Sequence, residues 1–393
     1  MRRRLAVILF AAAGLAAGRP GLAQVPAPQP RLVAEFREPD VKAIFQVEVS
    51  DDGRRVAALA GDEVLVWDLE TQRRLARVRG EASADRTAVL RFSPDGELLA
   101  VAWPGGEVDV LETRRGTPMA RLAGMGKGRH WPVFSPDSRR LALANCKEGP
   151  FALWDLKGLA RPGWFASRWR LWRGPLAVAP AVGPTAGLRR EAVCRLRFSD
   201  DGSRLFGVTA GGALYSWDPG LGGNGTMLAE SGVEAVDGRG HRAVTARGVL
   251  NLNTQEVLTQ PPVQFAGRLL FAGFTSDGGT AFIASSGGFA ILDGDTGREY
   301  EAFGGCGITG RDRAAPFVNG ADWFIRVCSG RPELGVWNLR RGEPVLEMPL
   351  EKATDRTDRQ AADQVAAQAS AAAGLLVTGG IDGIVRVWKP ILK

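Results

Sequence analysis

Five short stretches of this chain are near-copies of one another. The clearest copy is Phe92-Ser93-Pro94-Asp95-Gly96, and an apolar residue followed by an acidic one, Leu111-Glu112, begins 19 residues after Phe92. The same spacing, within one residue, separates each of the other copies from such a dipeptide. A fixed internal period is the signature of a repeat architecture, so it constrains the fold more than any local signal does. The copies begin at Val49, Phe92, Phe134, Phe198 and Phe274.

The second copy shows what one repeat contains. Its turn has Pro94 and Gly96 where a tight β-turn needs a preset φ and a permissive one. Apolar stretches flank the turn, a third run alternates Val108 and Val110 with acidic residues, and a fourth covers Pro118–Leu122. Four short strands that recur about every 40–45 residues form one blade of a β-propeller. We therefore predict an all-β fold built of four-stranded antiparallel blades.

Several of these residues resemble WD40 repeats. Trp-Asp dipeptides begin at Trp67, Trp154 and Trp217, and a Gly-Gly-Ile-Asp-Gly turn precedes a strand that contains Trp388. The resemblance covers nearly the whole chain after residue 30. It implies a propeller that works as a non-catalytic protein-interaction scaffold.

The resemblance also implies structural aspartates in the turns before the third strands, at Asp382 and Asp62. The upstream Gly-His of the family is matched only loosely, by His130. Since the chain has two histidines, the His–Ser–Asp–Trp hydrogen-bond network of that family cannot recur in most blades.

Counting the dipeptide positions gives eight blades, with seven as the alternative because the fifth blade (Val233–Pro261) is short and irregular. The last blade depends on register: Ser370 precedes Trp388 by 18 residues. Alanine is the best helix former, so the segment Gln360–Ala373 could otherwise form a helix; we expect a strand. The positions counted are Trp67, Leu111, Trp154, Trp217, Leu252, Leu292, Trp337 and Trp388.

The two ends of the chain are expected to pair. The last repeat stops soon after Trp388, before a fourth strand, while Arg31–Phe36 has no blade of its own. Pairing these ends closes the ring and leaves no open junction between the first and last blades. The N-terminal strand is thus predicted to be the outer strand of the last blade.

The first residues are typical of an export signal. Three arginines, an apolar run and small residues indicate a signal peptide over residues 1–23, followed by a Pro-rich linker over residues 24–30. We expect residues 31–393 to form one propeller domain with an insertion at about 157–191. No other segment reaches the roughly 20 apolar residues of a membrane span, so we predict an exported protein, periplasmic or secreted.

The charge of the chain does not indicate nucleic-acid binding. The formal net charge of +7 falls to +3 without residues 1–23, which hold four arginines and no acid. The remaining arginines are spread along the sequence rather than concentrated on one face, as a nucleic-acid interface requires. We expect a monomer whose partner is another protein.

The four cysteines are an even set, and exported proteins usually pair them. The blade register places each predicted pair on one rim, in the same or in neighbouring blades. Disulfides Cys146–Cys194 and Cys306–Cys328 are therefore favoured over the two other pairings. Four buried thiols are the alternative, because cysteine is often buried.

The insertion is the largest departure from the repeat and carries the candidate interaction surface. Tryptophan and arginine are the residue types enriched at binding hot spots. The alternatives are an outer strand with Trp169 and Leu171 facing inward, followed by a loop, or a membrane-surface segment. The candidate residues are Trp164, Phe165, Arg168, Arg170, Trp172 and Arg173.

Signals for an enzyme are weak, and no catalytic residue, metal or cofactor is predicted. His130 and His241 have no nucleophile at a motif spacing, and the acidic pairs Asp51-Asp52 and Asp200-Asp201 are expected to be solvated turn residues. Ala290–Gly297 resembles the repeat of quinone-cofactor dehydrogenases, which also have eight blades, but it occurs once. The alternative function is therefore a propeller oxidoreductase or a hydrolase with its site at the mouth of the central channel.

Overall fold

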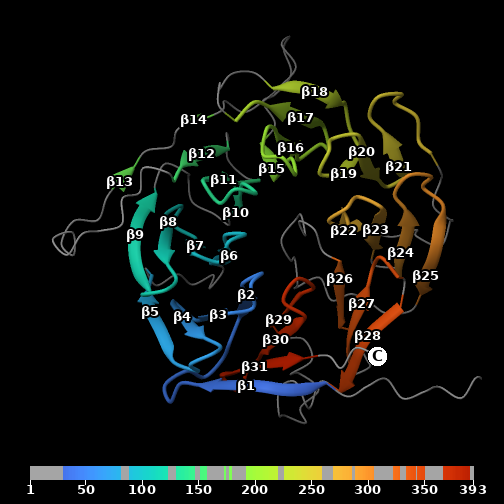
Figure 1. Ribbon diagram of the computed structural model, residues 1–393. Coiled ribbons are helices and arrows are strands. Elements are labelled where there is room, and N and C mark those ends of the chain that lie inside the picture. The colour runs from blue at the N-terminus through green and yellow to red at the C-terminus, as the bar shows by residue number, and fades with distance from the viewer. Residues whose placement is uncertain are drawn as a thin grey trace, which may run out of the picture.

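The structure is a computed structural model, and every regular element in its described residues is a β-strand (Figure 1). An all-β architecture was predicted from the repeat and is confirmed. The described residues are 30–80, 88–122, 130–146, 151–156, 172–173, 177–178, 192–219, 225–258, 269–285, 288–304, 322–327, 333–341, 343–349 and 366–389.

The strands within these ranges form eight sheets, which we number in chain order. The first contains β2 (Gln46–Val49), β3 (Arg55–Ala60), β4 (Glu63–Asp68) and β5 (Arg74–Arg79). The second contains β6 (Val89–Phe92), β7 (Leu98–Ala102), β8 (Val108–Glu112) and β9 (Thr117–Leu122), with β13 (Trp172–Arg173) beside β9. The third contains β10 (Trp131–Phe134), β11 (Arg140–Ala144), β12 (Ala152–Asp155) and β14 (Ala177–Val178). The fourth contains β15 (Val193–Phe198), β16 (Leu205–Thr209), β17 (Leu214–Trp217) and β18 (Thr226–Ala229).

The remaining sheets follow the same plan. The fifth contains β19 (Val233–Val236), β20 (Arg242–Thr245) and β21 (Gly248–Asn251). The sixth contains β22 (Leu269–Phe274), β23 (Thr280–Ser285), β24 (Gly288–Asp293) and β25 (Glu299–Gly304). The seventh contains β26 (Trp323–Val327), β27 (Glu333–Asn338) and β28 (Glu343–Pro349). The eighth contains β29 (Ala366–Ser370), β30 (Leu375–Gly379) and β31 (Ile384–Lys389), with β1 (Arg31–Arg37) paired to β31.

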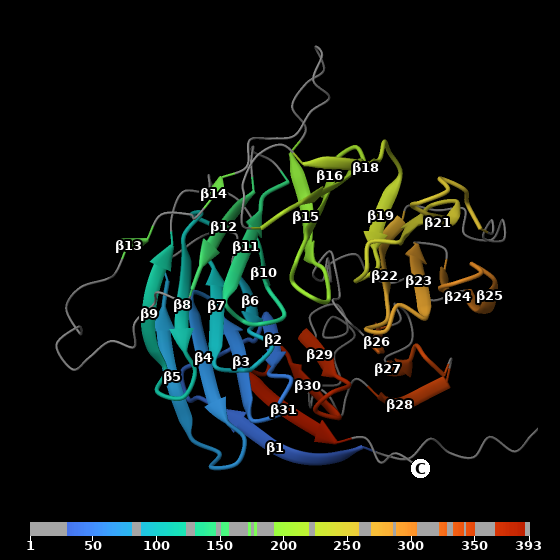
Figure 2. The ribbon, with the colours of Figure 1, turned by 45° about the horizontal axis from the view of Figure 1, so that its top comes forward.

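The sheets follow one another around a common centre, which is a propeller-like arrangement (Figure 1). The first strand of a complete sheet lies nearest the centre and the last lies outermost, as β2 and β5 show. The tilted view places the first and the last sheet side by side (Figure 2).

Apolar side chains hold each sheet against the next. The described residues form seven buried clusters. Every two sheets that are consecutive in the chain share one of these clusters, and so do the last and the first sheet. In the cluster that joins the last and first sheets, Val377 and Val385 belong to the last sheet and Val56 and Leu65 to the first. These four side chains are fully buried, so both faces of a sheet contribute to the core.

The predicted pairing of the chain ends is present. Strand β1 pairs antiparallel with β31, and a register shift between Leu32 and Ala34 leaves one extra residue in β1. Phe36 lies against Trp67 of the first sheet, with ring centroids 5.1 Å apart and ring planes at 18°. Strand β1 therefore completes the last sheet and also contacts the first.

The repeated turn is held by short-range hydrogen bonds that its sequence encodes. In the second sheet the Ser93 hydroxyl donates to Asp95 at 2.6 Å and accepts the N–H of Leu98 at 2.9 Å. Gly96 adopts a φ of +68°, a left-handed conformation that suits glycine. In the third sheet Ser138 occupies this position at φ +60°, and its hydroxyl accepts the N–H of Asp95 from the second sheet at 3.2 Å.

The strand pairing tests two predictions, one for the last sheet and one for the fifth. The segment that could have been helical contains β29, so the strand expected from the position of Ser370 is confirmed. In the fifth sheet, however, the position equivalent to a Trp-Asp pair is Leu250-Asn251, and the prediction of Leu252 was wrong by two residues. Asn251 pairs with Arg242 as Asp68 pairs with Arg55. Asn251 replaces the usual acid, and this obscured the register.

The contact of β1 with the first sheet predicts different stability effects for two residues of the same strand. Phe36→Ala should lower the free energy of unfolding by about 3–5 kcal/mol, because Phe36 is buried against Trp67. Leu32→Ala is the matched control, since Leu32 is 44% exposed, and it should cost about 1 kcal/mol or less. Denaturant unfolding of both variants measures the difference. Equal losses would show that β1 is not packed on the first sheet in solution.

Candidate functional site

One strand of the insertion lies at the outer edge of the second sheet. Strand β13 pairs in parallel with the end of β9, joining Trp172 to Arg121 and Arg173 to Leu122. Trp172 and Arg173 are thus on the outer edge of the second sheet. The other four candidate residues lie outside the described part of the chain: Trp164, Phe165, Arg168 and Arg170.

The outer strand of the third sheet is not where the sequence suggested. Trp169 and Leu171 were considered for this strand but lie outside the described residues. Strand β14 takes the position instead: Ala177 pairs with Leu153 and Val178 with Ala152. This stretch was expected to be a loop, and a strand of two residues has too few positions to show an alternation.

The edge that receives β13 is fixed by a buried polar group. The Arg121 guanidinium donates to both carboxylate oxygens of Asp109, at 2.7 and 2.8 Å, and Trp103 Nε1 donates to the same carboxylate at 2.8 Å. Asp109 is 4% exposed. Asp109 of β8 therefore fixes Arg121 of β9 within the second sheet. Strand β13 pairs with this fixed part of β9.

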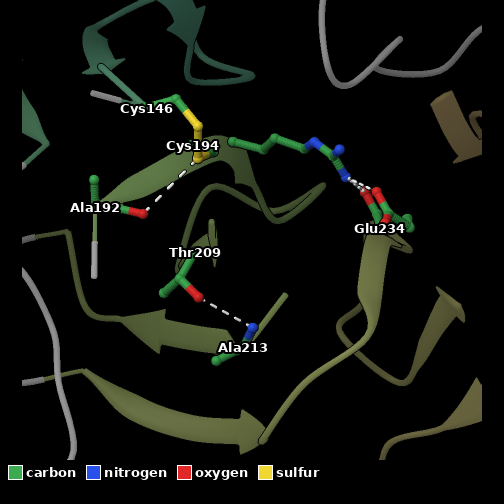
Figure 3. Close-up of a disulfide and its surroundings, with 7 residues drawn as sticks. Cys146, Ala192, Cys194, Thr209, Ala213 and Glu234 are labelled. Atoms are coloured by element: carbon green, nitrogen blue, oxygen red, sulfur yellow. Dashed lines mark hydrogen bonds and ion pairs between the residues drawn. A yellow bond between two sulfur atoms is a disulfide. The ribbon is translucent and has the colours of Figure 1, made fainter. Parts of the chain in front are cut away.

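One of the two predicted disulfides is present, Cys146–Cys194 (Figure 3). Cys146 follows β11 in the third sheet and Cys194 belongs to β15 in the fourth, so the bond joins neighbouring sheets. Cys306 and Cys328 lie outside the described residues. The bond closes a loop that contains the whole insertion.

Side chains from one innermost strand satisfy the backbone edge of the next. The Gln46 amide both accepts from the N–H and donates to the carbonyl of Leu90, each at 3.3 Å. Arg195 donates to the Glu234 carbonyl at 2.7 Å, and Gln368 accepts the N–H of Val49. These contacts matter because an unpaired strand edge exposes backbone donors and acceptors.

A group of charged residues belongs to the same inner strands and was missed by the sequence analysis. Glu48 on β2 is 4% exposed and accepts a hydrogen bond from Arg91 of β6 at 3.2 Å. Burial raises the pKa of Glu48 to about 7, an effect that nearby Asp51 increases and Arg91 opposes. Partial desolvation raises the pKa of Asp51, although this residue lies exposed at the surface, and its carboxylate is hydrogen-bonded to Ser370 of the last sheet. The signal in the sequence is a charged residue two positions before the serine of the repeated turn.

The other acids of the repeated turn serve local structure. The Asp52 and Asp201 carboxylates each accept a backbone N–H two residues later, at 3.0 Å, and hydrogen-bond the turn serine. Hydrogen bonds from Ser199 and Ser203 lower the pKa of Asp201 to about 2. These residues are exposed, which agrees with the solvated turn role expected for them.

The turn aspartates named by the family resemblance lie between second and third strands. The carboxylate of Asp382 accepts from Arg386 at 2.6 Å, and that of Asp62 accepts from Arg79 at 3.1 Å. Trp388 Nε1 donates to Thr378 at 3.0 Å. Buried His130 is within 3.2 Å of the Asn145 amide, and the backbone N–H of His241 donates to Asp237 at 2.8 Å. The His130 side chain therefore makes a buried polar contact, whereas this contact of His241 is made by its backbone.

The segment that resembled quinone-cofactor enzymes forms an ordinary turn of this fold. Asp293 accepts from the hydroxyl of Thr296 at 2.8 Å, as Asp68 accepts from that of Thr71 at 2.9 Å. The same turn therefore follows the third strand in the first and sixth sheets. Its Asp-x-x-Thr pattern needs no cofactor to explain it.

Three further results bear on the chemistry of the chain. The described residues contain no group of three or more His, Cys, Asp or Glu side chains arranged to hold a metal ion. The same part of the chain has no helix long and apolar enough to cross a membrane. The chain matches no protein-family model and no curated protein.

The disulfide leads to a prediction about stability. Replacing Cys146 and Cys194 together by serine should lower the free energy of unfolding by about 3–4 kcal/mol, since the bond restricts the unfolded chain. The sheets should persist, because their clusters are independent of the bond. Denaturant unfolding measures the loss, and peptide mapping without reductant identifies the linkage. A crossed pair such as Cys146–Cys306 would show that the assigned register is wrong.

Proposed function

We propose that this protein is an exported, WD40-like propeller of eight blades that acts as a non-catalytic platform for binding another protein. Each sheet is one blade in this proposal, and strand β1 closes the ring. A ring of this kind presents rigidly held connections on its surface, and such connections commonly carry binding.

Three observations support the closed ring. The described strands group into eight sheets. Apolar clusters join each sheet to the next and the last sheet to the first. The cluster between the last and the first sheet, for example, contains Val385 and Val56. The pairing of β1 with β31 supplies an outer strand from the opposite end of the chain.

The observation that carries the binding proposal is the path of the insertion. Strand β13 belongs to the second sheet and β14 to the third, although three residues separate them in the chain. The insertion therefore contributes a strand to the outer edge of each of two sheets, and β14 completes the third sheet. Its sequence from Trp164 to Arg173 is rich in tryptophan and arginine, the residue types that dominate binding energy at interfaces.

Export is supported by two independent features. The first 23 residues have the pattern of a signal peptide, and the chain contains the disulfide Cys146–Cys194. Disulfides form and persist mainly in oxidising compartments. A periplasmic or secreted location suits both.

A second candidate function, an enzyme with a site near the centre, is favoured by one observation. Glu48 has a pKa raised to about 7 and lies on an innermost strand, and perturbed carboxyls of this kind occur in active sites. Its burial and its hydrogen bond to Arg91 account for the same shift as part of a junction between sheets. Incubation with a quinone cofactor and a divalent cation, followed by gel filtration, separates these functions: stoichiometric retention would favour the enzyme.

The binding proposal predicts that the insertion determines partner capture. The chain from residue 24 would be immobilised and exposed to the exported fraction of its source cells. Replacing Trp164, Phe165, Arg168, Arg170, Trp172 and Arg173 by alanine should reduce capture of its main partner by at least about ten-fold, since single hot-spot side chains contribute about 2 kcal/mol or more.

The control for this experiment removes charge from the same sheet at a different place. Arg114 and Arg115 lie in the turn between β8 and β9, with side chains 60% and 69% exposed. Changing both to alanine should leave capture intact. Undiminished capture by the insertion variant, with an unchanged melting temperature, would place the binding surface elsewhere.

A further inference from the structure

The first sheet meets both of its neighbours through one compact group of charged side chains. Glu48 on β2 faces the second sheet, where Arg91 of β6 donates to its carboxylate at 3.2 Å and the backbone N–H of Phe92 donates a further hydrogen bond. Asp51, in the turn after β2, bonds to Ser370 of β29 in the last sheet. The group thus extends across three sheets, including the last sheet, in which β1 pairs with β31.

The charges of this group do not balance when both acids are ionised. Arg91 attracts both Glu48 and Asp51, and the two carboxylates repel each other. Two negative charges then share one positive charge.

The other groups around Glu48 do not supply a second cation. Arg55, at the start of β3, donates to the carbonyl of Gly96 at 2.9 Å and lies 3.9 Å from Asp52. The last sheet presents Ser370 and Gln368, both neutral, through β29, and Thr378 of β30 accepts from Trp388. Asp52 is engaged by Ser50 and by the backbone of its own turn.

We propose that Glu48, Asp51 and Arg91 form a proton-responsive clamp that holds the last, first and second sheets together. The clamp is tight when Glu48 carries a proton, because one carboxylate then faces one guanidinium. It loosens when Glu48 ionises, because a buried carboxylate is added without a second cation. The inference rests on the contacts between sheets and is independent of what the protein binds.

The direction of the pH effect follows from proton linkage. Burial raises the pKa of Glu48 from 4.5 to about 7, so the closed junction holds more protons than the open one between these values. Stability of the junction therefore falls as the pH rises through that window and is greatest on its acidic side. This is opposite to the usual behaviour of an ion-paired carboxylate, whose pKa is lowered.

Elsewhere the inner strands provide a matched pair without the extra acid. Arg195 of β15 bonds to the carboxylate and to the backbone carbonyl of Glu234 in β19, across the junction of the fourth and fifth sheets (Figure 3 shows Glu234). Their side chains are 24% and 26% exposed. One acid faces one cation there.

Hydrogen exchange detected by mass spectrometry tests the clamp in the intact protein. Exchange of peptides that contain β2 and β29 would be measured at pH 6 and pH 8 and corrected for the intrinsic pH dependence of exchange. The opening equilibrium of these strands should increase about ten-fold over this range, as expected for the shift of Glu48. Glu48→Gln should remove the increase and keep the opening at pH 8 below the wild-type value at pH 6. Glu234→Gln should retain the wild-type response of β2 and β29.

Asp51→Asn provides a second measurement if Glu48→Gln does not fold. Removing the Asp51 charge lowers the pKa of Glu48 in the closed junction, so the rise in opening should end at a lower pH and the increase between pH 6 and pH 8 should be smaller. The proposal is overturned if the wild-type opening of β2 and β29 is the same at pH 6 and pH 8. It is equally overturned if Glu48→Gln keeps the full increase, or if Asp51→Asn leaves the increase between pH 6 and pH 8 unchanged.

Discussion

The central strands of these sheets are apolar on both faces, and the rest of the structure depends on this constraint. In β4, the run Val64–Trp67 is buried throughout, although consecutive side chains of a strand point to opposite faces. A sheet of this kind is stable only between two neighbours. In an open row of sheets, the first and the last would each expose an apolar face. The packing of Val377 and Val385 against Val56 and Leu65 covers both of these faces at once. It also explains why the N-terminal strand is used to complete the last sheet.

Much of this architecture could be predicted from the sequence because its determinants are local. The turn at Ser93–Gly96 is held by hydrogen bonds that span no more than five residues, so its pattern predicts its structure directly. Register then identified β29, although alanine-rich composition favours a helix. The same reasoning misplaced the dipeptide of the fifth sheet, because Leu250-Asn251 has neither a tryptophan nor an acid, whereas each other dipeptide has at least one of them. A local pattern predicts the register of a repeat only where that repeat keeps the residues of the pattern.

The site could be predicted less well because its contacts are distant in the chain. Trp172 pairs with Arg121 in a parallel strand of two residues, which leaves no periodicity to detect. Glu48 and Arg91 are 43 residues apart, yet each stands two positions before the serine of its own turn. Superposing the repeats would have shown these two charges at the same position in consecutive copies. Arg197 and Gln368 occupy that position in the fourth and last sheets and also bond to the backbone of a neighbouring sheet.

This shared position shows how the backbone edge of each innermost strand obtains hydrogen bonds. Each faces the centre, where no further strand pairs with β2, β6 or β15 in the described sheets. A side chain from the adjacent sheet supplies the hydrogen bond instead, and glutamine or arginine can do so without titrating near neutrality. A carboxylate at the same place carries a desolvation cost that varies with pH. Glu48 therefore makes the junction between the first sheet and its neighbours sensitive to protons, at the inner strands, whereas β13 and β14 lie at the outer edges of the second and third sheets.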